Sequence, residues 1–76
     1  MDGGNLKTGK VSWFNQEKGI GFIEDENNNL VLVDVSSISS KKKELVKGQL
    51  VRFDFEEDPT GELIATTVKP EKGLDL

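Results

Sequence analysis

The feature of this sequence that most restricts its fold is the short period of its apolar residues. Between residues 51 and 56, apolar side chains alternate with charged ones: Val51, Phe53 and Phe55 against Arg52, Asp54 and Glu56. Successive side chains of a strand point to opposite faces, so this pattern predicts a half-buried antiparallel strand. No stretch keeps the helical period over three turns. We therefore expect an all-β chain.

Five segments are predicted to be strands, with turn-forming residues between them. They span residues 6–15, 19–24, 30–36, 49–57 and 62–68. The connection 36–48 is long and polar, and it has room for one helical turn. Five short strands with one long link predict a small barrel or sandwich. With 76 residues the chain has room for one domain, so we expect a single domain over 1–76, with the barrel at about 6–69 and a frayed tail at 70–76.

The composition argues against catalysis. The chain has no histidine and no cysteine, which removes the usual general base, the commonest metal ligand and any thiolate or disulfide. The consecutive acids Glu56, Glu57 and Asp58 lie at a strand end and do not form a convergent pair. We therefore predict no enzyme activity, no catalytic residues, no metal, no cofactor and no small-molecule substrate.

The sequence also lacks an apolar run of membrane-spanning length or an apolar signal core near Met1. We therefore expect a cytoplasmic protein without a membrane partner, and a monomer, with weak self-association left open. The net charge of −4 by itself disfavours a nucleic-acid partner, since phosphate binding usually leaves a basic footprint. The local field of one face matters more than this total.

The aromatic residues of the first half carry the functional signal. Trp13 and Phe14 are adjacent, so a regular strand cannot bury both on one face, and one ring is expected to face solvent. Phe22 is predicted to share a face with Ile20. Exposed rings beside lysines are typical of proteins that stack bases and hold phosphates. The alternative is that Trp13, Phe14 and Phe22 fill a small core.

The arrangement of three segments is more specific than any one residue. Residues 9–23 read GKVSWFNQEKGIGFI, residues 31–38 read VLVDVSSI, and residues 45–53 read LVKGQLVRF. They resemble the G-x-V-K-W-F-N-x-x-K-G-F-G-F-I, V-F-V-H-F-S-A-I and L-x-x-G-Q-x-V-x-F segments of bacterial cold-shock proteins. The resemblance covers about residues 6–69. It implies a five-stranded antiparallel OB-fold barrel that binds single-stranded RNA or DNA, often as an RNA chaperone.

The chain departs from this family pattern mainly on the expected binding face. Ser12 replaces a lysine, Ile20 replaces a phenylalanine, and Leu32, Asp34 and Val35 stand for phenylalanine, histidine and phenylalanine. The long loop often carries a further phenylalanine, but here it reads Lys41-Lys42-Lys43. Core-type positions are kept: Val11, Ile23, Val31, Val33, Ile38, Val51 and Phe53. We therefore expect an intact barrel with weaker nucleic-acid binding than is typical of the family.

The predicted nucleic-acid-binding residues combine rings, apolar side chains and lysines. They are Lys10, Trp13, Phe14, Lys18, Ile20, Phe22, Leu32, Asp34, Val35, Lys41, Lys42 and Lys43. Asp34 is expected to point outward, where its carboxylate repels phosphate, accepts a hydrogen bond from a base amino group, or is simply solvated. The loop lysines equally fit a solvated charge run. The alternative function is a protein-interaction module that uses an aliphatic patch of Ile20, Leu32 and Val35.

Overall fold

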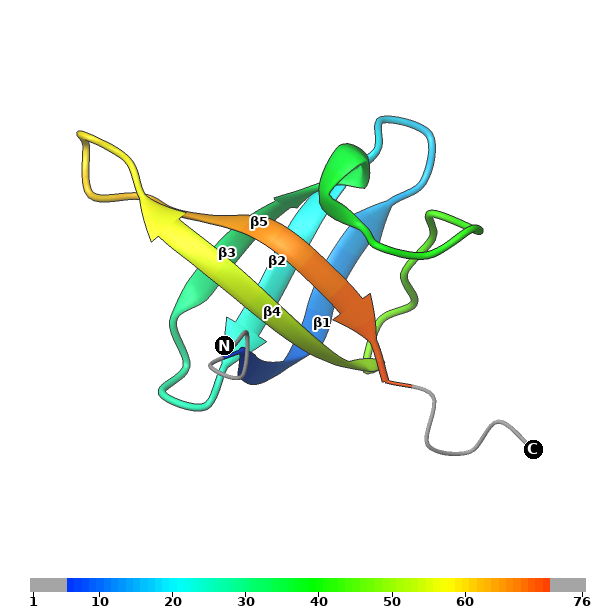
Figure 1. Ribbon diagram of the computed structural model, residues 1–76, viewed down its shortest axis with the longest axis horizontal. Helices are drawn as coiled ribbons and strands as arrows, with labels where there is room; N and C mark the ends of the chain where they lie inside the picture. The colour runs from blue at the N-terminus through cyan, green and yellow to red at the C-terminus, as the bar shows by residue number, and fades with distance from the viewer. Residues whose placement is uncertain (1–5, 72–76) are drawn as a thin grey trace.

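The computed structural model describes residues 6–71, and over this range the chain is all-β, as predicted (Figure 1). Its elements are β1 (Lys7–Asn15), β2 (Ile20–Asp25), β3 (Leu30–Asp34), the 3₁₀ helix η1 (Val35–Ser37), β4 (Leu50–Glu57) and β5 (Leu63–Pro70). Most strand ends lie within a residue of the prediction. Two differ by two residues, because β3 ends where η1 begins and β5 continues to Pro70. The expected tail therefore begins after Pro70, and its residues 72–76 lie outside the described range.

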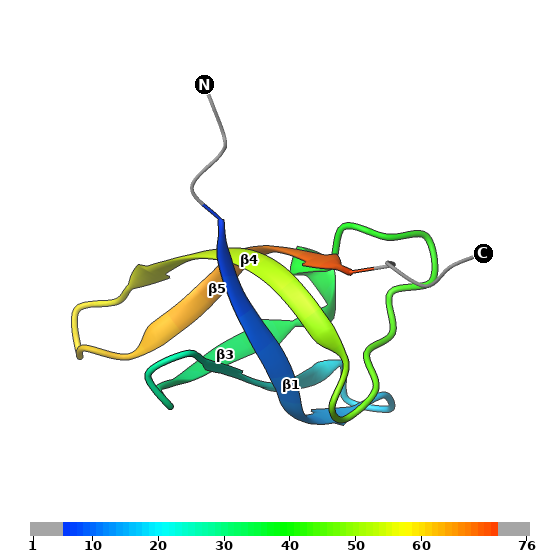
Figure 2. The same cartoon turned by 90° about the horizontal axis from the view of Figure 1, so that it is seen from below.

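The strands close into a barrel in the order β1-β2-β3-β5-β4. The β1–β2, β2–β3, β1–β4 and β4–β5 pairs are antiparallel. The closing pair between β3 and β5 is parallel and is made at Leu32 and Ile64. Figures 1 and 2 show β4 and β5 crossing over the sheet of β1, β2 and β3. This topology is consistent with the predicted OB-fold barrel.

The barrel interior is filled by the inward-facing residues of the alternating strands. All seven predicted core residues are buried there, together with Leu45, Ala65 and Val68. Leu45 belongs to the long connection between η1 and β4, so this loop places one apolar side chain in the core. Within residues 6–71, no helix has the length and apolar character needed to cross a bilayer.

Candidate nucleic-acid interface

An irregularity in β1 decides which of the two adjacent rings faces solvent. Val11 pairs with Ile23 of β2, but the next pair joins Trp13 to Phe22, so the register shifts at Ser12. A bulge of this kind changes which face the following side chains point to. Val11 is buried, whereas Trp13, two positions later, is 47% exposed. Phe14 turns inward instead and packs against the core.

The exposed Trp13 ring has an aromatic neighbour on β2. The centroids of the Trp13 and Phe22 rings are 6.3 Å apart, and the planes are tilted by 31°. Phe22 is only half-buried, so both rings contribute to the outer surface of the β1–β2 hairpin. The prediction of a solvent-facing ring is thus confirmed, and Trp13 is that ring. Phe14 is partly buried and packs against the core, so it supports the hairpin from inside.

The next positions on the outer face of β2 and β3 are mainly aliphatic. Phe22 pairs with Leu32, and Ile20 pairs with Asp34. Ile20 is 37% exposed, whereas Leu32 is half-buried. Asp34 is exposed, as expected from its place beside Leu32. The surface therefore runs from two rings at one side to a carboxylate at the other.

Asp34 has a local structural role that the sequence interpretation missed. It is the N-cap of η1, and its Oδ1 accepts a hydrogen bond of 2.9 Å from the backbone N–H of Ser36. This bond fixes the direction of the carboxylate and ends β3. An Asp directly after an apolar run is the signal that predicts such a cap, because its side chain accepts a backbone N–H two residues on.

The cap also explains why Val35 is not on a strand. It begins η1, its N–H donates to the carbonyl of Gly19, and its side chain packs partly against the core. A Cβ on Gly19 would lie 3.0 Å from a Val35 methyl group. Of the three residues of the predicted aliphatic patch, Leu32 and Val35 are half-buried and Ile20 is 37% exposed.

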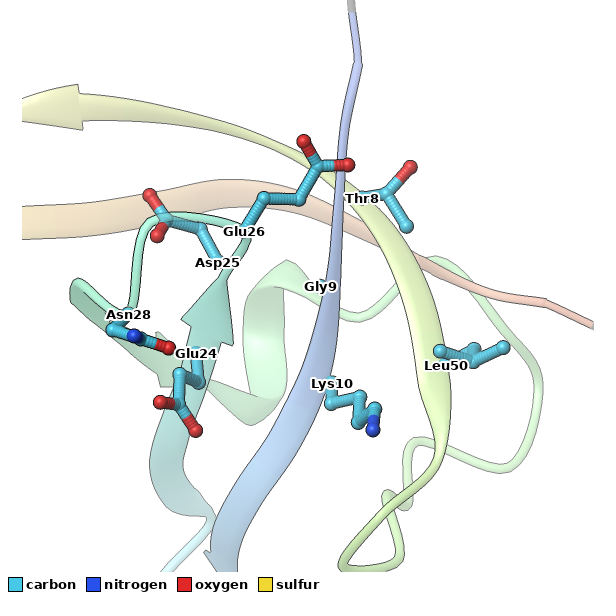
Figure 3. Close-up of a pocket in the computed structure, with 8 residues that line it drawn as sticks. All are labelled: Thr8, Gly9, Lys10, Glu24, Asp25, Glu26, Asn28 and Leu50. Atoms are coloured by element: carbon cyan, nitrogen blue, oxygen red, sulfur yellow. The ribbon is translucent and has the colours of Figure 1, made fainter.

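The predicted lysines lie in different charge environments. Lys18 is exposed in the turn between β1 and β2, next to the start of the ring-bearing strand. Lys10 is exposed on β1 but pairs directly with Glu24. Figure 3 shows Lys10 in a shallow pocket that is also lined by Glu24, Asp25 and Glu26. These acids partly offset the charge of Lys10.

The Asp25 side chain in this pocket forms hydrogen bonds within the β2–β3 turn. Burial by itself raises the pKa of its carboxyl group, but hydrogen bonds from Asn29 and Asn27 and the charge of Lys7 outweigh this effect. The pKa therefore lies below its ordinary value. Because Asp25 Oδ1 accepts the backbone N–H groups of Asn27 and Asn29, the carboxylate holds the β2–β3 turn together.

The three loop lysines are all exposed, but they are not equivalent. The Nζ of Lys43 donates a 2.9 Å hydrogen bond to the carbonyl of Ile38. Lys43 also has a positive φ of 52°, so both its backbone and its side chain shape the loop. Lys41 and Lys42 have no hydrogen bond of this kind among the described residues, and they present their charge to solvent.

A residue outside the predicted site connects this loop to the hairpin. Gln16, in the β1–β2 turn, accepts a hydrogen bond of 3.3 Å at its Oε1 from the N–H of Leu45. The contact brings the lysine-bearing loop beside the turn that carries Lys18. Nothing in the sequence pattern around Gln16 indicates this contact, since it joins residues far apart in the chain.

Comparison with known proteins shows the family to which this barrel belongs. The profile of the "Cold-shock" DNA-binding domain family matches residues 7–70. The chain is 46% identical over 65 residues to cold shock protein CspA of Staphylococcus saprophyticus and to cold shock protein CspC of Bacillus subtilis. Each alignment covers 84% of this chain and 98% of the relative. The chain therefore belongs to the cold-shock domain family, whose members are non-enzymatic nucleic-acid-binding proteins.

Proposed function

We propose that this chain binds single-stranded RNA or DNA by stacking bases on Trp13 and Phe22. The observation that carries the proposal is the 47% exposed Trp13 ring beside the half-buried Phe22 ring on an intact barrel. Single strands fit this surface better than duplexes, since only unpaired bases have free faces to stack. Lys18, Lys41 and Lys42 supply the phosphate contacts, with a smaller share from Lys10.

The binding is weaker than is typical of the family. A stacked base contributes roughly 1–3 kcal/mol when the ring is removed by alanine substitution. Ile20, Leu32 and Val35 keep apolar contact but not stacking. If each loses about 1 kcal/mol, the affinity falls on the order of 10²-fold. Weak contacts of this sort hold a strand unpaired only briefly, which suits an RNA chaperone. The cytoplasmic location and the monomeric state stay predictions.

The experiment is a binding titration with a fluorescently labelled oligothymidine or oligouridine, followed by anisotropy at low and at moderate salt. The Trp13→Ala variant is expected to bind about 5- to 150-fold more weakly, which corresponds to the loss of about one stacked base. Val46→Ala is the matched control, because Val46 is 65% exposed but lies outside the strands. It is expected to change the dissociation constant by less than about twofold.

Two outcomes would overturn the proposal. The first is a wild-type dissociation constant weaker than about 10⁻⁴ M at low salt, where electrostatic affinity is greatest. The second is a Trp13→Ala variant that is folded by circular dichroism and binds as well as the wild type.

The protein-interaction alternative has less geometric support. Its patch depends on three aliphatic side chains, but Leu32 and Val35 are half-buried and Val35 packs against the core. Ile20 alone offers too little apolar area to anchor a stable protein interface. A pull-down that returns a protein partner independent of RNA, together with no oligonucleotide binding, would favour it.

A further inference from the structure

The candidate surface carries a negative charge, that of Asp34, beside the rings on which bases are proposed to stack. Asp34 is exposed and is the cross-strand partner of Ile20. Ile20 lies two positions before Phe22 on β2. On β3, Asp34 lies two positions from Leu32, which is the cross-strand partner of Phe22. Asp34 is therefore a diagonal neighbour of the Phe22 ring. Such neighbours lie about 7–8 Å apart and their Cβ atoms are somewhat closer, so a base over the ring can reach the carboxylate.

The carboxylate is held in place before any ligand arrives. Its Oδ1 is engaged by the N–H of Ser36 at 2.9 Å, and the backbone of Asp34 has the extended conformation of an N-cap, with φ −114° and ψ 150°. Among residues 6–71 no hydrogen bond is donated to Oδ2. Asp34 thus presents one fixed acceptor atom at the edge of the stacking surface, with little further ordering needed on binding.

A fixed acceptor distinguishes between the two kinds of pyrimidine. Cytosine carries an amino group at C4, which donates a hydrogen bond to carboxylates. Uracil and thymine carry a carbonyl oxygen there, which is itself an acceptor and is repelled. Their N3–H lies between two carbonyl oxygens, so a carboxylate that approaches it meets repulsion on both sides.

We propose that Asp34 makes this surface select cytosine over uracil and thymine. The inference rests on the proposed function, because it needs a base stacked on Phe22. One charge-assisted hydrogen bond gained by cytosine and one repulsion suffered by uracil predict about five- to tenfold tighter binding of a cytosine strand.

The test compares short oligocytidine and oligouridine strands of equal length, by anisotropy, above neutral pH. These strands have equal backbone charge, so the change that an Asp34 variant makes in the ratio of their dissociation constants isolates the base edge. The informative variant is Asp34→Asn. Asparagine caps helices as well as aspartate does, and its Oδ1 still accepts from Ser36, but its free atom is now the donor Nδ2. The ratio is expected to fall to about one or to invert in favour of uracil.

Asp54→Asn is the matched control for the loss of one negative charge. Asp54 is also exposed on a strand, and its Oδ1 accepts the N–H of Phe55, but it lies on β4, away from the rings. It should leave the cytosine-to-uracil ratio unchanged. A wild-type ratio near one, a preference for uracil, or an equal effect of Asp34→Asn on both strands would overturn the selectivity while leaving the proposed function in place. Failure of the wild type to bind either strand would overturn both.

Discussion

At the scale of single residues, the candidate surface depends on an unusually close approach of β2 to β1. A Cβ added to Gly21 would collide with the carbonyl oxygen of Trp13 and lie 2.7 Å from the Cα of Phe14. The missing side chain therefore allows Phe14 to pack inward directly against the β2 backbone. Because Phe14 points inward, the adjacent Trp13 is free to point outward. Gly21 thus helps to determine that the Trp13 ring is the exposed one, although Gly21 itself is buried.

Gly21→Ala is accordingly expected to destabilise the fold by about 3 kcal/mol, since the colliding atoms are backbone atoms that move only with the strand. Gly48→Ala is the control. Gly48 has a positive φ of 87° and nothing within 4 Å of an added Cβ, so its cost is limited to about 1–2 kcal/mol of backbone strain. Urea unfolding measures both. A Gly21→Ala variant that is as stable as Gly48→Ala would refute the close-approach account.

At the scale of elements, the long loop between η1 and β4 is held by three side-chain contacts. These are Lys43 to Ile38, Gln16 to Leu45 and Gln49 to Val46, at 2.9, 3.3 and 2.9 Å. They place the loop beside the β1–β2 turn. Of the three consecutive lysines in the loop, one therefore has a structural contact and two present free charge.

This division predicts different effects on the salt dependence of binding. Replacing Lys41 and Lys42 together by glutamine should reduce the slope of log affinity against log salt by up to about 1.4, or about 0.7 per lost phosphate contact on a single strand. Lys43→Gln should reduce it less, and should lower the free energy of unfolding by about 1 kcal/mol. Arg52→Gln, on the outer side of β4, should leave the slope unchanged. A larger slope change for Lys43→Gln than for Lys41→Gln or Lys42→Gln would contradict this division.

The β4–β5 turn is stabilised by one carboxylate. Asp58 accepts hydrogen bonds from the Thr60 hydroxyl at 2.7 Å and from the N–H groups of Thr60 and Glu62, each at 2.9 Å. The Thr60 hydroxyl is the largest influence, and with these amides it holds the pKa of Asp58 below its ordinary value of 3.8. A pKa that is lower in the folded state than in the unfolded state stabilises the fold at pH values above 3.8. This stabilisation is lost as the pH falls through the pKa of the folded state.

Asp58→Ala is therefore expected to be less stable than the wild type near neutral pH, with the difference narrowing as the pH falls below 3.8. Thr60→Val removes the hydroxyl donor. This change should weaken the pH dependence of the free energy of unfolding without abolishing it. Urea unfolding across the acidic range gives the comparison. A difference between Asp58→Ala and the wild type that grows towards low pH would reverse the predicted sign.

The elements also show what the sequence was able to predict. The alternation of Val51, Phe53 and Phe55 correctly placed a strand and part of the core, because strand parity is a local property. The choice of Trp13 over Phe14 as the exposed ring was left open, because it depends on a register shift against a second strand. The prediction that Val35 lies on a strand was wrong, because β3 ends at Asp34, where the side chain accepts the N–H of Ser36 and starts η1. The parallel closure of β3 against β5 depends on contacts distant in sequence.

At the scale of the whole molecule, charge is divided between two ends. Residues 54–62 carry five acidic residues and no basic one, whereas residues 41–47 carry four lysines and one glutamate. The β4–β5 turn and the lysine-bearing loop lie at opposite ends of the long axis (Figure 1), which extends over 40 Å. The Debye length at physiological salt is about 8 Å. The acids that make the net charge negative therefore act little on the lysine-bearing end.

Neutralising two of these acids is a direct check on this separation. The double variant Glu56→Gln with Glu57→Gln should change the affinity for single strands by less than about twofold at physiological salt, because Leu32 and Ile64 separate Glu56 from Phe22 across the sheet, a path of roughly 14 Å that exceeds the Debye length of about 8 Å. Anisotropy titration measures the change. A tenfold gain in affinity would mean that the net charge, and not the local field, controls binding.

The central claim is that bases stack on the Trp13 ring, and its emission reports that event directly because the chain has one tryptophan. The measurement is Trp13 fluorescence, with its accessibility to acrylamide, during titration with a single-stranded oligonucleotide. Stacking predicts quenched emission and a ring protected from acrylamide at saturation. Binding that is complete by anisotropy while Trp13 emission and accessibility stay unchanged would contradict the account.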